Sequence, residues 1–194
     1  MKIKRDILLN KLINAKNHNL IKILVGMRRC GKSFLLFNLF KQHLIENGID
    51  ASHIIEIDLE SDEFIFCRDA ITLGKEIRSR LPKDNDQCFV LIDEIQLAAP
   101  ILPEGTDLSR LHPNDRDNAY ITFYHVLNGL LKRDNVSILT IWAGTAGECP
   151  LADTPCLFPG LHLTALHTDG KGRPFCSLLT LLLKLVNSSL SVKS

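Results

Sequence analysis

The chain has 194 residues, of which 45% are hydrophobic and 23% charged, and its formal net charge is +1. These values are typical of one globular domain with a core of its own. The near-neutral charge gives no reason to expect binding to nucleic acid or to an anionic membrane. The longest apolar run, 178–186, contains a threonine and a lysine and is too short to span a bilayer.

Cysteine usage and the first residues both favour a cytoplasmic protein. The six cysteines form no C-x-x-C pair, so neither a zinc site nor a thioredoxin-like motif is supported. Free thiols in a reducing compartment are the simplest interpretation. The apolar run near the N-terminus covers only residues 7–9, which is too short for the core of a signal peptide.

The first part of the chain predicts a helix, a strand and a second helix. Apolar residues at helical spacing predict a helix over residues 4–18. Residues 20–25 are apolar on both faces, as expected of a central parallel strand. A largely apolar helix follows from about residue 32 to residue 46, and Asn47-Gly48 is a typical stop signal.

Between this strand and helix lies GMRRCGKS at 26–33, which matches G-x-x-x-x-G-K-[ST]. Glycine at 26 and 31 lets the backbone N–H groups converge on one concavity, and the helix start adds its positive dipole end. Lys32 is then expected to contact the β- and γ-phosphates of a nucleotide, and the Ser33 hydroxyl to ligate Mg²⁺. The predicted nucleotide-binding residues are Gly26, Met27, Arg28, Arg29, Cys30, Gly31, Lys32, Ser33 and Phe34.

The next segment predicts a strand, an acidic turn and a helix. Residues 53–59 alternate between apolar and polar and predict the second strand. The acidic turn that follows, 60–63, is interpreted as a solvated loop rather than as a place for metal or a partner. Asp69 is the expected N-cap of a helix over 70–81, with Glu76 and Arg80 paired on its outer face.

The third predicted strand, 88–92, ends in Asp93-Glu94, which is the second strong signal. A carboxylate at a strand tip can bind Mg²⁺ directly or through water, and this role is predicted for Asp93. Glu94 is expected to point the other way along the pleat and to activate a water for attack on the γ-phosphorus. The catalytic residues predicted for this chemistry are therefore Glu94 and Lys32, with Ser33 and Asp93 on the metal.

The later part of the chain is less regular. Residues 97–118 predict a long mobile insertion rather than a substrate lid. An amphipathic helix is predicted over 119–132 and a fourth strand over 136–142. From 143 onward, no alternation of strands and helices is visible.

Several stretches together resemble prokaryotic ATPases of the AAA superfamily, in the group whose ATPase module precedes a separate C-terminal domain. They are IKIL and GMRRCGKS before residue 34, FVLIDEIQ at 89–96 and VLNGLLKRDNV at 126–136. The resemblance covers about residues 2–141 and implies a P-loop α/β/α sandwich with a mainly parallel sheet. It implies a Walker A motif at Gly26–Ser33, a Walker B motif at Asp93-Glu94, ATP and Mg²⁺ as ligands, and a ring-like or dimeric assembly.

The tail departs from this family. The family has a polar sensor segment after its fourth strand and then a fifth strand, whereas this chain has Trp142–Pro150. Codons for these residues, read in a shifted frame, can specify a similar sensor segment, so we hypothesise a frameshift or sequence error near residue 141. We therefore expect an ATPase core at 1–142 and an atypical tail at 143–194, poorly ordered or non-native in sequence. Without a fifth strand, the sheet is expected to be incomplete, with one edge of the first strand unpaired.

The leading hypothesis is an ATP-binding, Mg²⁺-dependent ATPase module that binds nucleotide better than it hydrolyses it, because the sensor and any arginine finger cannot be assigned. One alternative is a small-molecule P-loop kinase, although adjacent Asp93 and Glu94 suit water activation better than binding of an acceptor hydroxyl. Another is a truncated, non-catalytic protein that binds nucleotide weakly or acts through an exposed edge. The sequence identifies no protein or nucleic-acid partner and leaves the oligomeric state open.

Overall fold

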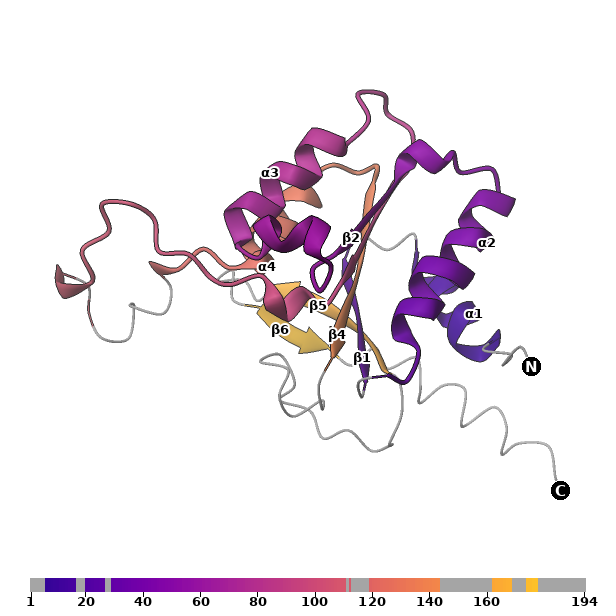
Figure 1. The fold of residues 1–194 in the computed structure, drawn as a ribbon, viewed down its shortest axis with the longest axis horizontal. Helices are drawn as coiled ribbons and strands as arrows, with labels where there is room; N and C mark the ends of the chain where they lie inside the picture. The colour runs from indigo at the N-terminus through magenta and orange to yellow at the C-terminus, as the bar shows by residue number, and fades with distance from the viewer. Residues whose placement is uncertain are drawn as a thin grey trace, which may run out of the picture.

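A six-stranded sheet in the order β2-β3-β4-β1-β5-β6 forms the centre of the molecule (Figure 1). The structure is a computed structural model that describes residues 6–16, 20–26, 29–110, 112, 119–143, 162–168 and 174–177. The strands are β1 (Ile21–Gly26), β2 (Ile54–Asp58), β3 (Cys88–Asp93), β4 (Val136–Ala143), β5 (His162–Thr168) and β6 (Pro174–Ser177). The first four are mutually parallel, and β5 and β6 continue the sheet in antiparallel pairings.

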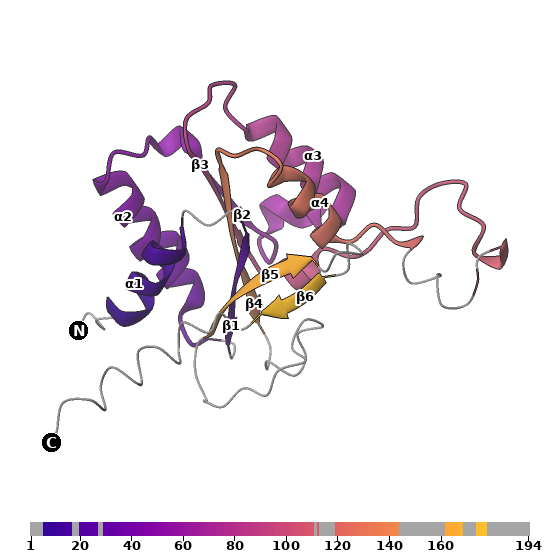
Figure 2. The ribbon, with the colours of Figure 1, turned by 180° about the vertical axis from the view of Figure 1, so that it is seen from behind.

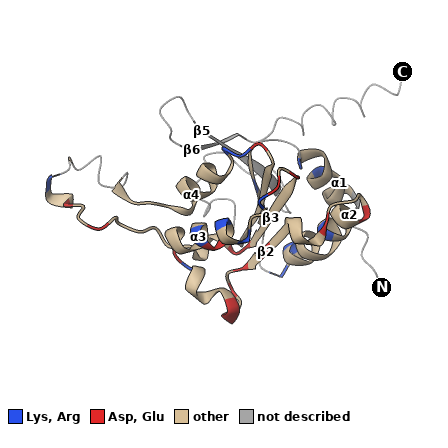
Figure 3. Cartoon of the chain, turned by 90° about the horizontal axis from the view of Figure 1, so that it is seen from above, with Lys and Arg blue, Asp and Glu red and all other residues tan. Residues whose placement is uncertain are grey.

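Helices cover both faces of the sheet, which gives three layers (Figures 2 and 3). On one face lie α1 (Asp6–Ala15) and a continuous helix that begins as the π-helix η1 (Phe34–Phe40) and ends as α2 (Lys41–Glu46). On the other face lie α3 (Ala70–Arg80) and α4 (Phe123–Leu130). The short 3₁₀ segments are η2 (Ala51–His53), η3 (Asp62–Cys67), η4 (Ile95–Leu97) and η5 (Leu108–Arg110).

The strand sequences explain the layers, because successive side chains alternate between the two faces of the sheet. In β1, Ile21 and Ile23 join the apolar cluster under α3 and α4, whereas Leu24 joins the cluster under α1 and α2. Phe40 anchors the second cluster and packs edge-on against Phe89, with 6.2 Å between ring centroids. Strands that are apolar on both faces therefore lie between two helical layers, as the sequence predicted.

The predicted fold class, an α/β sandwich of the P-loop type with a mainly parallel sheet, is confirmed. The helix expected over 70–81 is α3, and the side chain of its N-cap Asp69 accepts a 2.7 Å hydrogen bond from Thr72 N–H. Its Glu76 carboxylate pairs with Arg80 at 2.6 Å. The helix predicted from residue 32 differs in its first turns, which are π-helical, and the helix predicted over 119–132 is shorter than expected.

The expectation that β1 has an unpaired edge is wrong. The parallel part of the sheet has four strands, but β5 lies antiparallel beside β1, with Ile21 opposite Leu166 and Val25 opposite His162. Backbone hydrogen bonding between these strands satisfies the edge that a fifth parallel strand would otherwise cover. Most of the remaining tail, like residues 111 and 113–118 of the long insertion, lies outside the described residues.

Candidate functional site

The loop after β1 has the backbone geometry that the glycine-rich motif predicts. Gly26 is the last residue of β1 and pairs with Ala143 of β4. Arg29 and Gly31 both have positive φ, at 60° and 81°, a region that L-residues rarely adopt. Alternation of ordinary and left-handed residues turns successive N–H groups toward one concavity, which is the geometry of an anion-binding nest.

The helix begins immediately after this loop. Leu35 N–H donates to Gly31 C=O at 3.1 Å, so the helix start and its positive dipole end lie at the loop. Met27 and Arg28, both in the predicted nucleotide-binding set, lie outside the described residues. Cys30 is half-buried in the loop, and Phe34 is exposed on the first turn of the helix.

Lys32 lies folded into the loop rather than extended into solvent. Its side chain is buried, with 5% of its surface exposed, and its ammonium donates a 2.7 Å hydrogen bond to Gly26 C=O. This contact joins the two ends of the motif and holds a positive charge within the concavity. A buried ammonium beside the start of a helix favours an anionic group at this position.

Asp93 ends β3 and lies close to Ser33 and Lys32, although β4 separates β1 from β3. Asp93 is 4% exposed, and its carboxylate hydrogen-bonds the side chain of Ser33 and accepts a 2.8 Å hydrogen bond from Glu94 N–H. Burial raises the pKa of Asp93, and the nearby Asp58 raises it further, against the opposing effects of Ser33, the Glu94 N–H and Lys32. A cation bound here would relieve this electrostatic cost.

Sequence reasoning missed Asp58 as part of this site. Asp58 ends β2 and lies opposite Asp93 in the parallel register, and Leu59 N–H donates to Asp93 C=O at 3.4 Å. The available signal was the acidic end of a strand, because the carboxyl ends of parallel strands meet at one edge.

Glu94 does not continue the pleat of β3, because the strand ends at Asp93, so the pleat gives no direction for its side chain. Its backbone turns into the left-handed region, with φ 52° and ψ 46°, and its side chain is 8% exposed. Non-glycine residues in this region carry a cost of order 1–3 kcal/mol and are concentrated at functional sites. The turn brings the Glu94 carboxylate to the side-chain amide of Gln96, which donates to it.

Gln96 is a second residue that sequence reasoning missed. Its amide N–H₂ binds Glu94, whereas its carbonyl oxygen is buried and has no hydrogen-bond partner within the part of the chain that the structure describes. The local sequence gives no signal for this contact, because it depends on the left-handed backbone of Glu94.

Together these groups form one site at the carboxyl ends of the parallel strands. The loop and Lys32 provide positive charge for phosphate, and Ser33 and Asp93 provide the hard oxygen donors that Mg²⁺ prefers. The donor set therefore fits a metal-bound phosphate. Glu94 is the neighbouring carboxylate that could accept a proton.

A family model described as "AAA domain" matches residues 18–124. The chain is also 35% identical, over 94 residues, to an "uncharacterized protein" of Haemophilus influenzae (strain ATCC 51907 / DSM 11121 / KW20 / Rd). This match covers 48% of the present chain and 23% of that relative, so the chain spans about a quarter of the relative's length. Among the described helices, none has the length and apolar character needed to cross a membrane.

Proposed function

Because the chain belongs to the AAA domain family, whose model covers more than half of it, we propose that it is a Mg²⁺-dependent module that binds ATP and hydrolyses it slowly. The observation that supports this proposal is the convergence of two segments that lie about sixty residues apart in the sequence, Lys32-Ser33 after β1 and Asp93 at the end of β3. The lysine supplies positive charge for phosphate oxygens, and the serine hydroxyl and the aspartate carboxylate supply oxygen ligands for the metal.

The residues have distinct proposed roles. Lys32 binds the β- and γ-phosphates with its ammonium, while N–H groups of the 26–33 loop bind phosphate oxygens. Ser33 and Asp93 hold the metal, which when bound neutralises charge on the phosphate oxygens. Glu94 accepts a proton from the attacking water as the bond between the γ-phosphorus and the leaving ADP oxygen breaks. Asp58 adds negative charge beside Asp93 and strengthens metal binding.

The contact between Gln96 and Glu94 favours binding over turnover. An amide that donates to the Glu94 carboxylate occupies an oxygen that a water molecule would otherwise use. A second candidate function, a nucleotide-binding module without turnover, rests on this same contact.

The binding experiment compares the wild type with Lys32→Ala. Loss of one charged phosphate contact is expected to weaken Mg-ATP binding about 10- to 100-fold, measured by titration calorimetry and by the rise in thermal midpoint. Lys75→Ala is the matched control, because Lys75 is exposed on α3, away from the 26–33 loop. Equal midpoint rises in all three proteins would refute nucleotide binding at this site.

Turnover distinguishes the two candidate functions. If the module hydrolyses ATP, Glu94→Gln should retain Mg-ATP binding and lower phosphate release at least about 100-fold. If the module only binds, the wild type and Glu94→Gln should show the same background release. Labelled acceptor products would instead favour a kinase.

A further inference from the structure

The outer edge of β2 ends the sheet, and its backbone groups are open to a further strand. In the described sheet, β2 is bonded to β3 on one side and to no strand on the other. Alternate N–H and C=O groups of an edge strand point away from the sheet and can pair with another chain. Edge strands are commonly protected by proline, a bulge or charged side chains, and β2, which reads Ile-Ile-Glu-Ile-Asp, has no proline and carries two negative charges.

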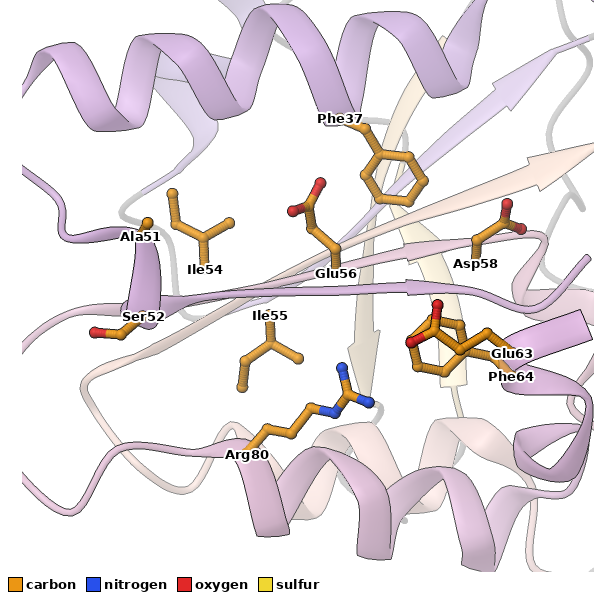
Figure 4. Close-up of a pocket in the computed structure, with 10 residues that line it drawn as sticks. All are labelled: Phe37, Ala51, Ser52, Ile54, Ile55, Glu56, Asp58, Glu63, Phe64 and Arg80. Carbon is orange, nitrogen blue, oxygen red and sulfur yellow. The ribbon is translucent and has the colours of Figure 1, made fainter. Parts of the chain in front are cut away.

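A groove of about 520 Å³ follows this edge between the two helical layers (Figure 4). Its walls are aromatic, with Phe37 on the α2 side and Phe64 on the α3 side. Arg80 lies 5.0 Å from the centroid of the Phe64 ring and closes the lower wall. The groove therefore has apolar sides and a polar backbone floor, a combination that suits an extended peptide better than a compact ligand.

The charges along the groove are mainly negative. Glu56, Asp58 and Glu63 line it together with Arg80, and the Glu56 carboxylate pairs with the Lys41 ammonium at 2.5 Å, so the carboxylates still outnumber the basic groups. Figure 4 shows Glu56 and Asp58 on the α2 side of β2, where Ile54 also points, whereas Ile55 points to the opposite side. The acidic turn after β2 adds Glu60 and Asp62 at the same end.

We propose that this edge binds an extended basic peptide segment of a partner protein, which adds to the sheet as a strand beside β2. Main-chain hydrogen bonds supply affinity, and alternate side chains of the peptide supply specificity. Basic side chains lie on the α2 side near Glu56 and Asp58, and apolar side chains lie on the opposite side near Ile55. Five residues suffice to cover β2, because an extended strand rises about 3.3 Å per residue.

The test uses the full chain without nucleotide, so its outcome does not depend on the proposed ATPase activity. The probe is a fluorescent eight-residue peptide of alternating lysine and valine, and binding is measured by fluorescence anisotropy. The same peptide with alternate backbone nitrogens methylated, and a version with glutamate in place of lysine, are expected to bind at least 10-fold more weakly. Absence of binding by the lysine peptide, or equal binding of all three peptides, would overturn the proposal.

A charge reversal in the groove tests the location. Glu56→Lys should weaken binding of the lysine peptide at least 10-fold. Lys41→Ala, which breaks the same Glu56–Lys41 ion pair but keeps the carboxylate, should not weaken it, and neither should Glu104→Lys, the same charge change at an exposed position outside the groove lining. Equal losses of peptide affinity in Glu56→Lys and Glu104→Lys would show that overall charge determines binding, and would refute this location. Sedimentation of the wild type alone completes the test, because a concentration-dependent dimer that Glu56→Lys dissociates would assign the edge to a second copy instead.

Discussion

A lysine buried in the central strand makes a sharp prediction about pH and stability. Lys22 lies in β1 with 1% of its surface exposed, and its ammonium donates a 3.3 Å hydrogen bond to Lys16 C=O. The Ser137 hydroxyl donates to the same carbonyl at 2.7 Å. Burial lowers the pKa of Lys22 from 10.5 to about 8, because the low-dielectric interior disfavours the charged amine.

The direction of the effect follows from proton binding in the two states. Between pH 8 and pH 10.5, the unfolded chain keeps its proton on Lys22 while the folded chain loses it. The free energy of unfolding therefore rises with pH in this window. From the separation between the two pKa values, Lys22 raises the free energy of unfolding by at most about 3 kcal/mol over the whole window. Between pH 7.5 and pH 9.5 the rise is about 2 kcal/mol.

Two buried cysteines act in the opposite direction, so the prediction must be tested as a difference. Burial raises the pKa values of Cys67 and Cys88 to about 11 from 9.0, and the folded state then keeps thiol protons that the unfolded state loses above pH 9. Both cysteines are unchanged in Lys22→Met, so comparison with the wild type cancels their contribution.

The assay is urea unfolding of the wild type and Lys22→Met at pH 7.5 and pH 9.5, followed by circular dichroism. We expect the variant to be the more stable protein at pH 7.5, because an apolar side chain of similar length avoids burial of a charge. Its advantage should shrink by about 2 kcal/mol at pH 9.5. An advantage that stays constant with pH, or that resembles the response of the exposed control Lys75→Met, would refute the reasoning.

Substitutions at four further positions test the packing, capping and backbone arguments. Gly74→Ala should destabilise the fold by about 1–3 kcal/mol in urea unfolding, because a Cβ there would lie 2.3 Å from Cγ1 of Val126. Gly129→Ala meets no atom within 4 Å and should instead stabilise α4 by about 0.5–1 kcal/mol. Asp69→Ala should cost about 1 kcal/mol through loss of the N-cap, and Asp69→Ser should restore most of it. Glu94→Gly should raise the thermal midpoint by relieving a positive φ while removing any ATP turnover, and an unchanged midpoint would contradict the strain argument.

The order and layers of the fold were predictable because buried parallel strands carry a strong sequence pattern. Runs such as 88–92 are apolar throughout, and the helices between them repeat apolar residues at helical spacing. The glycine-rich loop was predictable for a related reason, since its function requires particular residues at particular spacings. Its positive φ at Gly31 agrees with this requirement.

The remaining features depend on information that a local pattern does not contain. The position of Asp58 beside Asp93 follows from the register between β2 and β3, which links residues 35 apart in the chain. The contact of Gln96 with Glu94 depends on one unusual backbone conformation. The pairing of β5 with β1 relies on main-chain hydrogen bonds, which leave little trace in a segment without clear periodicity.

The place of β1 in the sheet has a consequence for biosynthesis. Its two neighbours, β4 and β5, begin at residues 136 and 162, more than a hundred residues after β1 itself. Contacts between such distant segments form slowly, and on the ribosome β1 cannot complete its strand pairing until β4 and β5 have emerged. We therefore expect the 26–33 loop to reach its final position only after β4 and β5 have been synthesised, so that a nascent chain gains the capacity to hold nucleotide no earlier than that point.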